Sequence, residues 1–151
     1  MSNSAKIKAK RYYDSWRKEK TYSPALKSNI KITLKGWRHI TGATGHKKRP
    51  FGDIYRRLKL LPYAKIVIKK STTIQNIVVK SKRKYYAIEA IVNIGEKDSK
   101  KLRKVRVIIQ EDKKGNYVFL SVMDKKAERL MLRSYDVSIM ESKNSLVQQE
   151  I

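Results

Sequence analysis

The chain has 151 residues and a formal net charge of +24, because 37 Lys and Arg stand against 13 Asp and Glu. This length fits one domain, and 40% hydrophobic residues are enough to build a core. The absence of cysteine excludes disulfides, thiolate metal sites and a cysteine nucleophile. No apolar run approaches the ~18 residues that a membrane span needs, so we expect a soluble protein.

The positive charge is concentrated in the first half of the chain. Residues 1–70 hold 20 of the basic and only 3 of the acidic residues, whereas residues 126–151 hold four of each. The electrostatic field of this positive charge attracts polyanions over long distances, but it gives no information about the fold. We therefore expect RNA, DNA, an anionic membrane or an acidic protein as the partner, in that order, with the contact on the N-terminal half.

The first 23 residues predict a basic helix or arm beside the main domain. Ser4 is suited to cap a helix that runs to about Lys20, although its apolar residues form no clean stripe. An arm could instead contact a nucleic-acid backbone and stack its aromatic side chains on bases. These side chains are Tyr12, Tyr13 and Trp16. We expect the domain itself to cover residues 24–141, followed by a flexible tail over residues 142–151.

The segment after this arm predicts a short strand. Ile30, Ile32 and Leu34 alternate with polar residues, which is the period of a half-buried strand, and Gly36 is expected to end it. His39 follows within Trp-Arg-His-Ile. A loop with two glycines then ends in the basic cluster His46, Lys47, Lys48 and Arg49.

Two helices are predicted next. Phe51, Ile54, Leu58 and Leu61 recur at intervals of three and four residues, which indicates an amphipathic helix. Pro62 is suited to the first turn of a second, short helix over residues 63–70.

The remaining chain predicts an antiparallel sheet. Residues 73–79, 84–92, 103–109 and 117–122 are rich in β-branched and aromatic residues and are joined by short polar connections. Gly115 in the last connection indicates a hairpin turn. The expected fold is therefore α+β, with N-terminal helices packed on one face of a roughly four-stranded antiparallel sheet.

Alternation along the strands predicts which side chains lie on the open face. If Val105, Val107 and Ile109 point inward, Lys104 and Arg106 point outward. If Val118, Leu120 and Val122 also point inward, the residues that share the face of Arg106 are Tyr117, Phe119 and Ser121. Cations, aromatic rings and a hydroxyl on one face suit RNA with unpaired bases.

Three segments of the sequence resemble segments of a known nuclease superfamily. They are Gly36-Trp-Arg-His39-Ile, Arg57-Leu-Lys-Leu-Leu-Pro62, and Lys104-Val-Arg-Val-Ile-Ile with Gly115 and Phe119-Leu-Ser121-Val. Over about residues 24–123 the chain resembles the barnase–EndoU–colicin–RelE superfamily of metal-independent ribonucleases, and within it the branch associated with phages and polymorphic toxins. The resemblance implies an endoribonuclease toxin that needs no cofactor, with an active site across the open sheet face.

The resemblance also implies roles for individual residues in cleavage through the ribose 2′-OH. His39 is the expected base or acid, Arg57 and Arg106 the phosphate clamp, and Ser121 a hydrogen-bond partner of the phosphate or the attacking hydroxyl. The expected substrate-binding residues are His46, Lys47, Lys48, Arg49, Tyr86, Lys104 and Phe119. Periodicity does not decide whether Tyr85 or Tyr86 faces the site.

The second proton-transfer residue stays open. The chain lacks the Glu–His pair of barnase and the His–His–Lys triad of EndoU at recognisable positions, and His46, Lys80 and Lys104 all remain candidates. Metal binding is not expected, because two histidines seven residues apart with only Asp53 near them are poor ligand spacing.

Structural and non-catalytic interpretations of the same residues compete with the ribonuclease interpretation. Without the resemblance, His39 beside Trp37 and Ile40 fits a packed structural histidine. A non-catalytic RNA- or DNA-binding protein explains the charge equally well, and its binding would fall steeply with salt. A membrane-active protein is not expected, because no segment has the strong amphipathic character required. A toxin would act on RNA, with tRNA as one candidate, in the cytoplasm of its own or a target cell, and its producer would need an acidic antitoxin or immunity protein.

Overall fold

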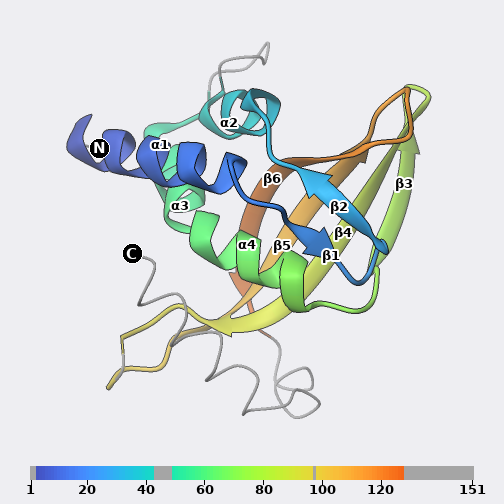
Figure 1. Cartoon of the computed structure of the whole chain (residues 1–151). Coiled ribbons are helices and arrows are strands. Elements are labelled where there is room, and N and C mark those ends of the chain that lie inside the picture. Colours follow the sequence, from blue (N-terminus) through green and yellow to red (C-terminus); the bar gives the residue numbers. More distant parts are fainter. Residues whose placement is uncertain (1–2, 43–48, 97, 128–151) are drawn as a thin grey trace.

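The computed structural model describes residues 3–42, 49–96 and 98–127. Within these ranges the chain forms four helices and a six-stranded, mostly antiparallel sheet, with helices packed on the sheet (Figure 1). The elements are α1 (Asn3–Arg17), β1 (Tyr22–Ser23), β2 (Ser28–Lys31), α2 (Leu34–Thr41), α3 (Phe51–Lys59), α4 (Leu61–Lys70), β3 (Asn76–Lys80), β4 (Arg83–Asn93), β5 (Leu102–Glu111) and β6 (Tyr117–Lys126). The α+β prediction is confirmed, with two strands more than expected.

The four predicted strands form a meander, β3 to β6, in which each strand pairs antiparallel with the next. The turn between β5 and β6 has Gly115 at φ 82°, a left-handed conformation that glycine adopts without strain. The Asp112 carboxylate closes this turn by accepting hydrogen bonds from the backbone N–H groups of Lys114 and Asn116. The hairpin expected from Gly115 is therefore present.

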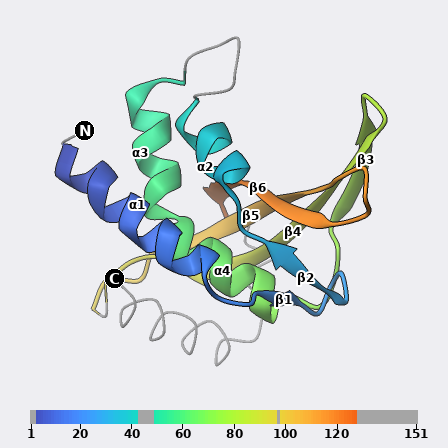
Figure 2. The ribbon, with the colours of Figure 1, turned by 45° about the horizontal axis from the view of Figure 1, so that its top comes forward.

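The two additional strands attach the N-terminal part of the chain to the far side of the meander. The sheet order is β1-β2-β6-β5-β4-β3, and β2 pairs parallel with β6, Ile30 lying opposite Tyr117. Figure 2 shows β1 and β2 beside β6, with β3 at the opposite end of the sheet.

The strand predicted over Ile30 to Leu34 is too long, and the residues after it are helical. β2 ends at Lys31, and the Thr33 side chain caps α2 by accepting a hydrogen bond from the N–H of Lys35. Trp37 and Ile40, three residues apart, bury the same face of α2. Alternation favoured a strand because Ile30 of β2, Ile32 of the connection and Leu34, the first residue of α2, are spaced two residues apart.

Gly36 does not end a strand but lets α2 approach β6 closely. A Cβ atom at this position would lie 2.6 Å from the hydroxyl oxygen of Tyr13 and 2.7 Å from the carbonyl oxygen of Phe119. No side chain larger than hydrogen fits between these atoms without displacement of the backbone or the ring. Gly36 therefore fixes the distance between α2 and the sheet.

Helix α1 belongs to the core. Tyr13 and Trp16 are 0% and 1% exposed, and both rings contact Phe119 of β6. The Trp16 indole donates a hydrogen bond of 2.9 Å to the Thr21 hydroxyl, so its polar atom is also satisfied. These two rings are not available to stack on bases.

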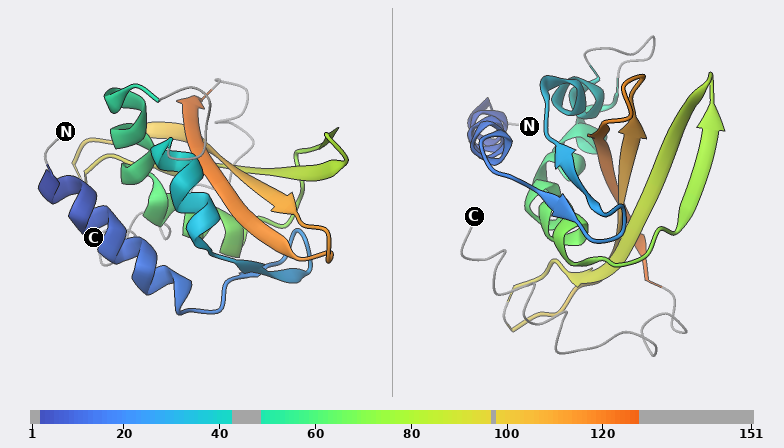
Figure 3. Two further views of the ribbon diagram at one scale, coloured as in Figure 1. Left: turned by 90° about the horizontal axis from the view of Figure 1, so that it is seen from above. Right: turned by 45° about the vertical axis from the view of Figure 1, so that its right-hand side comes forward.

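The core lies between the helices and one face of β4, β5 and β6 (Figure 3). Val105, Val107 and Ile109 are fully buried on this face, as alternation predicted, and α4 packs against it with eight consecutive buried residues. None of the helices in the described ranges combines the length and the hydropathy that crossing a membrane requires.

Candidate functional site

The face of β4 and β5 opposite the core carries a group of polar side chains. Glu89 of β4 lies opposite Arg106 of β5 in the register. Arg106 Nη1 donates a hydrogen bond of 2.6 Å to Glu89 Oε1, and Lys104 Nζ lies 3.6 Å from Glu89 Oε2. Glu89 is buried and held by two cations, which fixes Arg106 on this face.

Helix α2 brings two further basic residues to the same face. Lys35 and His39 lie one helical turn apart, so their side chains share one side of α2. The Lys35 ammonium donates a hydrogen bond to the side-chain carbonyl of Gln110 on β5. Gln110 in turn donates to the Tyr85 hydroxyl on β4 at 3.0 Å. Gln110, Arg106 and Lys104 are separated by even numbers of residues on β5 and therefore share one face.

Helix α3 connects His39 with β6 through a chain of contacts. Arg49 Nε donates to the His39 carbonyl at 3.0 Å, and Arg49 Nη1 lies 3.1 Å from Asp53 Oδ2. Arg57 Nε donates to the same Asp53 oxygen at 3.1 Å. Arg57 Nη1 then donates to Ser121 Oγ at 2.7 Å. One carboxylate thus holds two guanidinium groups, and one of them is anchored to the sheet.

His39 itself is half-buried, and within the described chain its ring atom Nδ1 is buried without a hydrogen-bond partner. Burial lowers the pKa of His39 below its ordinary value. The positive charges of Arg49 and Arg57 lower this pKa further, and Lys35 adds a smaller effect of the same sign. Burial and these neighbouring charges therefore favour the neutral form of the imidazole.

The four residues predicted to be catalytic come from four different elements and belong to one region. His39 is on α2, Arg57 on α3, Arg106 on β5 and Ser121 on β6. Ser121 contacts Arg57 and lies opposite Ile108, two positions along β5 from Arg106. Arg106 itself lies opposite Met123, so Ser121 and Arg106 are diagonal neighbours on one face of the β5–β6 pair, and Ser121 is buried there beneath Arg57.

Two of the predicted substrate-binding residues are in the core instead. The pairing of β5 with β6 shifts register between Ile108 and Ile109, which leaves Leu120 as an extra residue on β6. This bulge reverses the alternation and turns Phe119 inward, where it is fully buried. Tyr86 is also buried on the core face, and its hydroxyl bonds to Glu111. Tyr85, not Tyr86, is on the face of Gln110.

The other predicted positions divide into three groups. Arg49 and Lys104 lie within the polar cluster, through their contacts with Asp53 and Glu89. Lys80 is exposed at the end of β3, on the opposite side of the sheet from β6. His46, Lys47, Lys48 and the tail 142–151 lie outside the described residues.

Sequence reasoning missed Lys35, Asp53 and Glu89. Spacing could have found two of them: Asp53 precedes Arg57 by four residues on a predicted helix, and Lys35 precedes His39 by four. Glu89 gave no usable signal, because it interrupts an apolar run and the register of β4 against β5 depends on the irregular connection between them.

Among the described residues, no three His, Asp or Glu side chains gather as ligands for a metal ion. Known proteins offer no further guide. No protein-family model, curated protein or solved structure matches the chain. Functional inference therefore depends on the geometry of this cluster.

Proposed function

We propose that the protein is a metal-independent endoribonuclease that cleaves RNA, tRNA being one candidate substrate, by attack of a ribose 2′-OH on the adjacent phosphate. The observation that carries the proposal is the half-buried ring of His39, which lies among the positive charges of Arg49, Arg57 and Lys35. A partly exposed imidazole set among cations suits acid–base chemistry on an anionic ester. The resemblance to the barnase–EndoU–colicin–RelE superfamily supports the same function.

His39 is the proposed general base. Its lowered pKa keeps the ring neutral near pH 7, so it can accept the proton of the 2′-OH as the new bond to phosphorus forms. The bond from phosphorus to the 5′ oxygen then breaks, which leaves a 2′,3′-cyclic phosphate. Lys35, one turn from His39 on the same side of α2, is the proposed donor of the proton that the 5′ oxygen needs.

The guanidinium groups are the proposed electrostatic catalysts. Arg57 and Arg106 would bind the non-bridging phosphate oxygens and stabilise the charge that develops on the phosphorane, and the buried Ser121 hydroxyl would hold Arg57 in place rather than contact the phosphate itself. Asp53 and Glu89 are positioning residues in this scheme. Each holds a guanidinium by one oxygen, and because a guanidinium carries several N–H donors, others can contact a substrate.

An enzyme of this kind would be toxic in the cytoplasm where it meets cellular RNA. We therefore propose an acidic antitoxin or immunity protein as a partner, since opposite charge would favour fast association with a chain of net charge +24. Expression of the chain alone tests this: normal growth of the producing cells would remove the need for an inhibitor.

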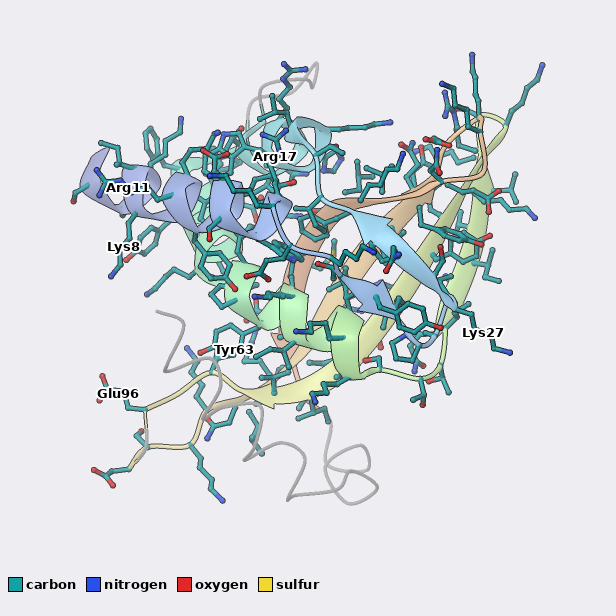
Figure 4. The ribbon with its side chains drawn as sticks, in the orientation of Figure 1. Lys8, Arg11, Arg17, Lys27, Tyr63 and Glu96 are labelled. Atoms are coloured by element: carbon teal, nitrogen blue, oxygen red, sulfur yellow. The ribbon has the colours of Figure 1, made fainter. Side chains whose placement is uncertain are left out.

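A non-catalytic RNA-binding protein is the second candidate. Lys8 and Arg11 on α1 and Lys27 in the turn between β1 and β2 are exposed cations remote from the cluster (Figure 4). Such side chains can bind a nucleic-acid backbone without any chemistry.

One experiment separates the two candidates. The purified protein is incubated with total RNA in EDTA, and the products are analysed for 2′,3′-cyclic phosphate ends. We expect discrete products from the wild type and a loss of roughly 10²–10⁴-fold in rate for His39→Ala. Arg38→Ala, an exposed neighbour on α2, is the control and should cleave normally. Binding that falls with salt and yields no product would favour the non-catalytic protein instead, and full activity of folded His39→Ala would exclude the proposed base.

A further inference from the structure

The edge of the sheet at β3 is the second unusual surface of the molecule. β3 is the last strand in the order and pairs only with β4, so within the described residues no strand pairs with its outer edge. Figures 1 and 3 show β3 at the outer border of the sheet, on the side away from the helices. Two intervening strands separate it from β6, which places these two strands about 14 Å apart at ~4.8 Å per strand, while the neighbouring β4 carries Glu89 of the candidate site.

The three central side chains of β3 are apolar and exposed on both faces. Ile77, Val78 and Val79 are 53%, 45% and 65% exposed, and they are consecutive. Soluble proteins usually protect an edge strand with proline, a bulge or an inward-pointing charge. β3 has none of these over Asn76–Val79, and its pairing with β4 is regular throughout. A regular, β-branched, unprotected edge can accept an additional strand.

The charged residues that follow β3 in the turn to β4 and at the start of β4 are all basic. The strand ends in Lys80, and the turn to β4 contains Lys82 and is followed by Arg83 and Lys84. Ser81 and Lys82 both have positive φ, 52° and 63°, which fits a tight type I′ turn that holds these cations close to the strand. The sequence has no acidic residue at all between Asp53 and Glu89.

We propose that the free edge of β3 binds an extended segment of an acidic protein, which adds to the sheet as a seventh strand. Backbone hydrogen bonds would supply the pairing, and apolar side chains of the partner would cover Ile77 and Val79. Acidic side chains flanking that segment would face the lysines of the turn. A second copy of this chain is a poor occupant, because it would bring another Lys-rich turn and another charge of +24 to the same edge. The proposal does not depend on catalysis.

A labelled octapeptide of alternating Glu and Val serves as the probe, and its binding to the full chain is measured by fluorescence anisotropy. Ile77→Lys places a charge on the edge, and Ile7→Lys adds the same charge on α1 at a side chain of nearly equal exposure, 52%. We expect Ile77→Lys to weaken binding roughly tenfold, a change of about 1.4 kcal/mol, and Ile7→Lys to have little effect. Hydrogen exchange should slow at alternate amides within Asn76–Lys80 when the peptide is bound.

Each control has an outcome that overturns the proposal. Equal weakening by both lysine variants would mean that general electrostatics, not β3, holds the peptide. Undiminished binding of the peptide with N-methyl groups at alternate backbone nitrogens would exclude strand addition. Equal binding of a Lys–Val peptide would exclude an acidic partner. A dimer of the wild type that Ile77→Lys dissociates would assign the edge to a second copy, and protection of the same amides by single-stranded RNA would assign it to nucleic acid.

Discussion

Replacement of Arg57 by lysine separates the charge of this residue from its geometry. The Arg57 side chain is 14% exposed and joins Asp53 and Ser121 through two different nitrogen atoms. A lysine ammonium is a single centre and cannot reproduce this fork. Because Ser121 is 1% exposed, loss of its partner leaves a buried hydroxyl unsatisfied, which costs about 1–3 kcal/mol in the free energy of unfolding.

The same substitution should reduce cleavage far more than it reduces stability. Loss of one aligned donor to the developing charge typically lowers the rate on the order of 10²-fold. We expect this decrease in single-turnover cleavage of a labelled RNA at saturating protein, in EDTA and at a temperature where the variant is folded. Arg56→Lys is the matched control, since Arg56 is 63% exposed on the same helix and its ion pair with Asp124 is 3.9 Å long. A destabilised Arg57→Lys that cleaves at the wild-type rate would refute the catalytic role and leave a structural one.

Two further predictions concern packing and pH. Gly36→Ala should lower the free energy of unfolding by about 1–3 kcal/mol in denaturant titration, because its methyl group would overlap two packed atoms. Gly52→Ala on α3, where an added methyl group would meet no atom within 4 Å, should be neutral or stabilising, and equal effects of the two substitutions would contradict the close approach of α2. The lowered pKa of His39 makes the unfolded chain bind more protons below pH ~6.5. The contribution of His39 to the free energy of unfolding is therefore fully present above pH ~6.5, and it is lost as the pH falls through the lower folded-state pKa. Thermal unfolding of His39→Gln should show a weaker acid decline than the wild type, and identical declines would count against the burial of a neutral ring.

The meander could be predicted from the sequence because each strand carries its own signal. Val105, Val107 and Ile109 alternate with Lys104, Arg106, Ile108 and Gln110, three of which are polar, and Gly115 marks a turn whose positive φ the structure contains. The start of α2 could not be predicted in the same way. There Ile30 and Ile32 satisfy the period of a strand, while the decisive helical features are the cap at Thr33 and the close packing of Gly36.

Some residues of the candidate site could be predicted from the sequence, but their arrangement could not. His39 and Arg57 were conspicuous for their chemical type, but only the folded chain brings Arg57 to Ser121. The face of Phe119 depended on one bulge residue, Leu120, because a single extra residue reverses alternation in everything beyond it. The periodicity of the β6 sequence cannot predict such a shift, since the shift is fixed by pairing with β5.

The parallel pairing of β2 with β6 determines when, during synthesis of the chain, the candidate site can be assembled. Ile30 pairs with Tyr117, and Arg57 meets a serine 64 residues later in the chain. Contacts between such distant segments close large loops and form late in folding. During synthesis, the helices that carry His39 and Arg57 emerge before the strands that complete the cluster. A nascent or truncated chain that ends before β6 therefore holds its histidine and arginine without the sheet that aligns them, which confines any activity of this cluster to chains whose β6 has been made and paired.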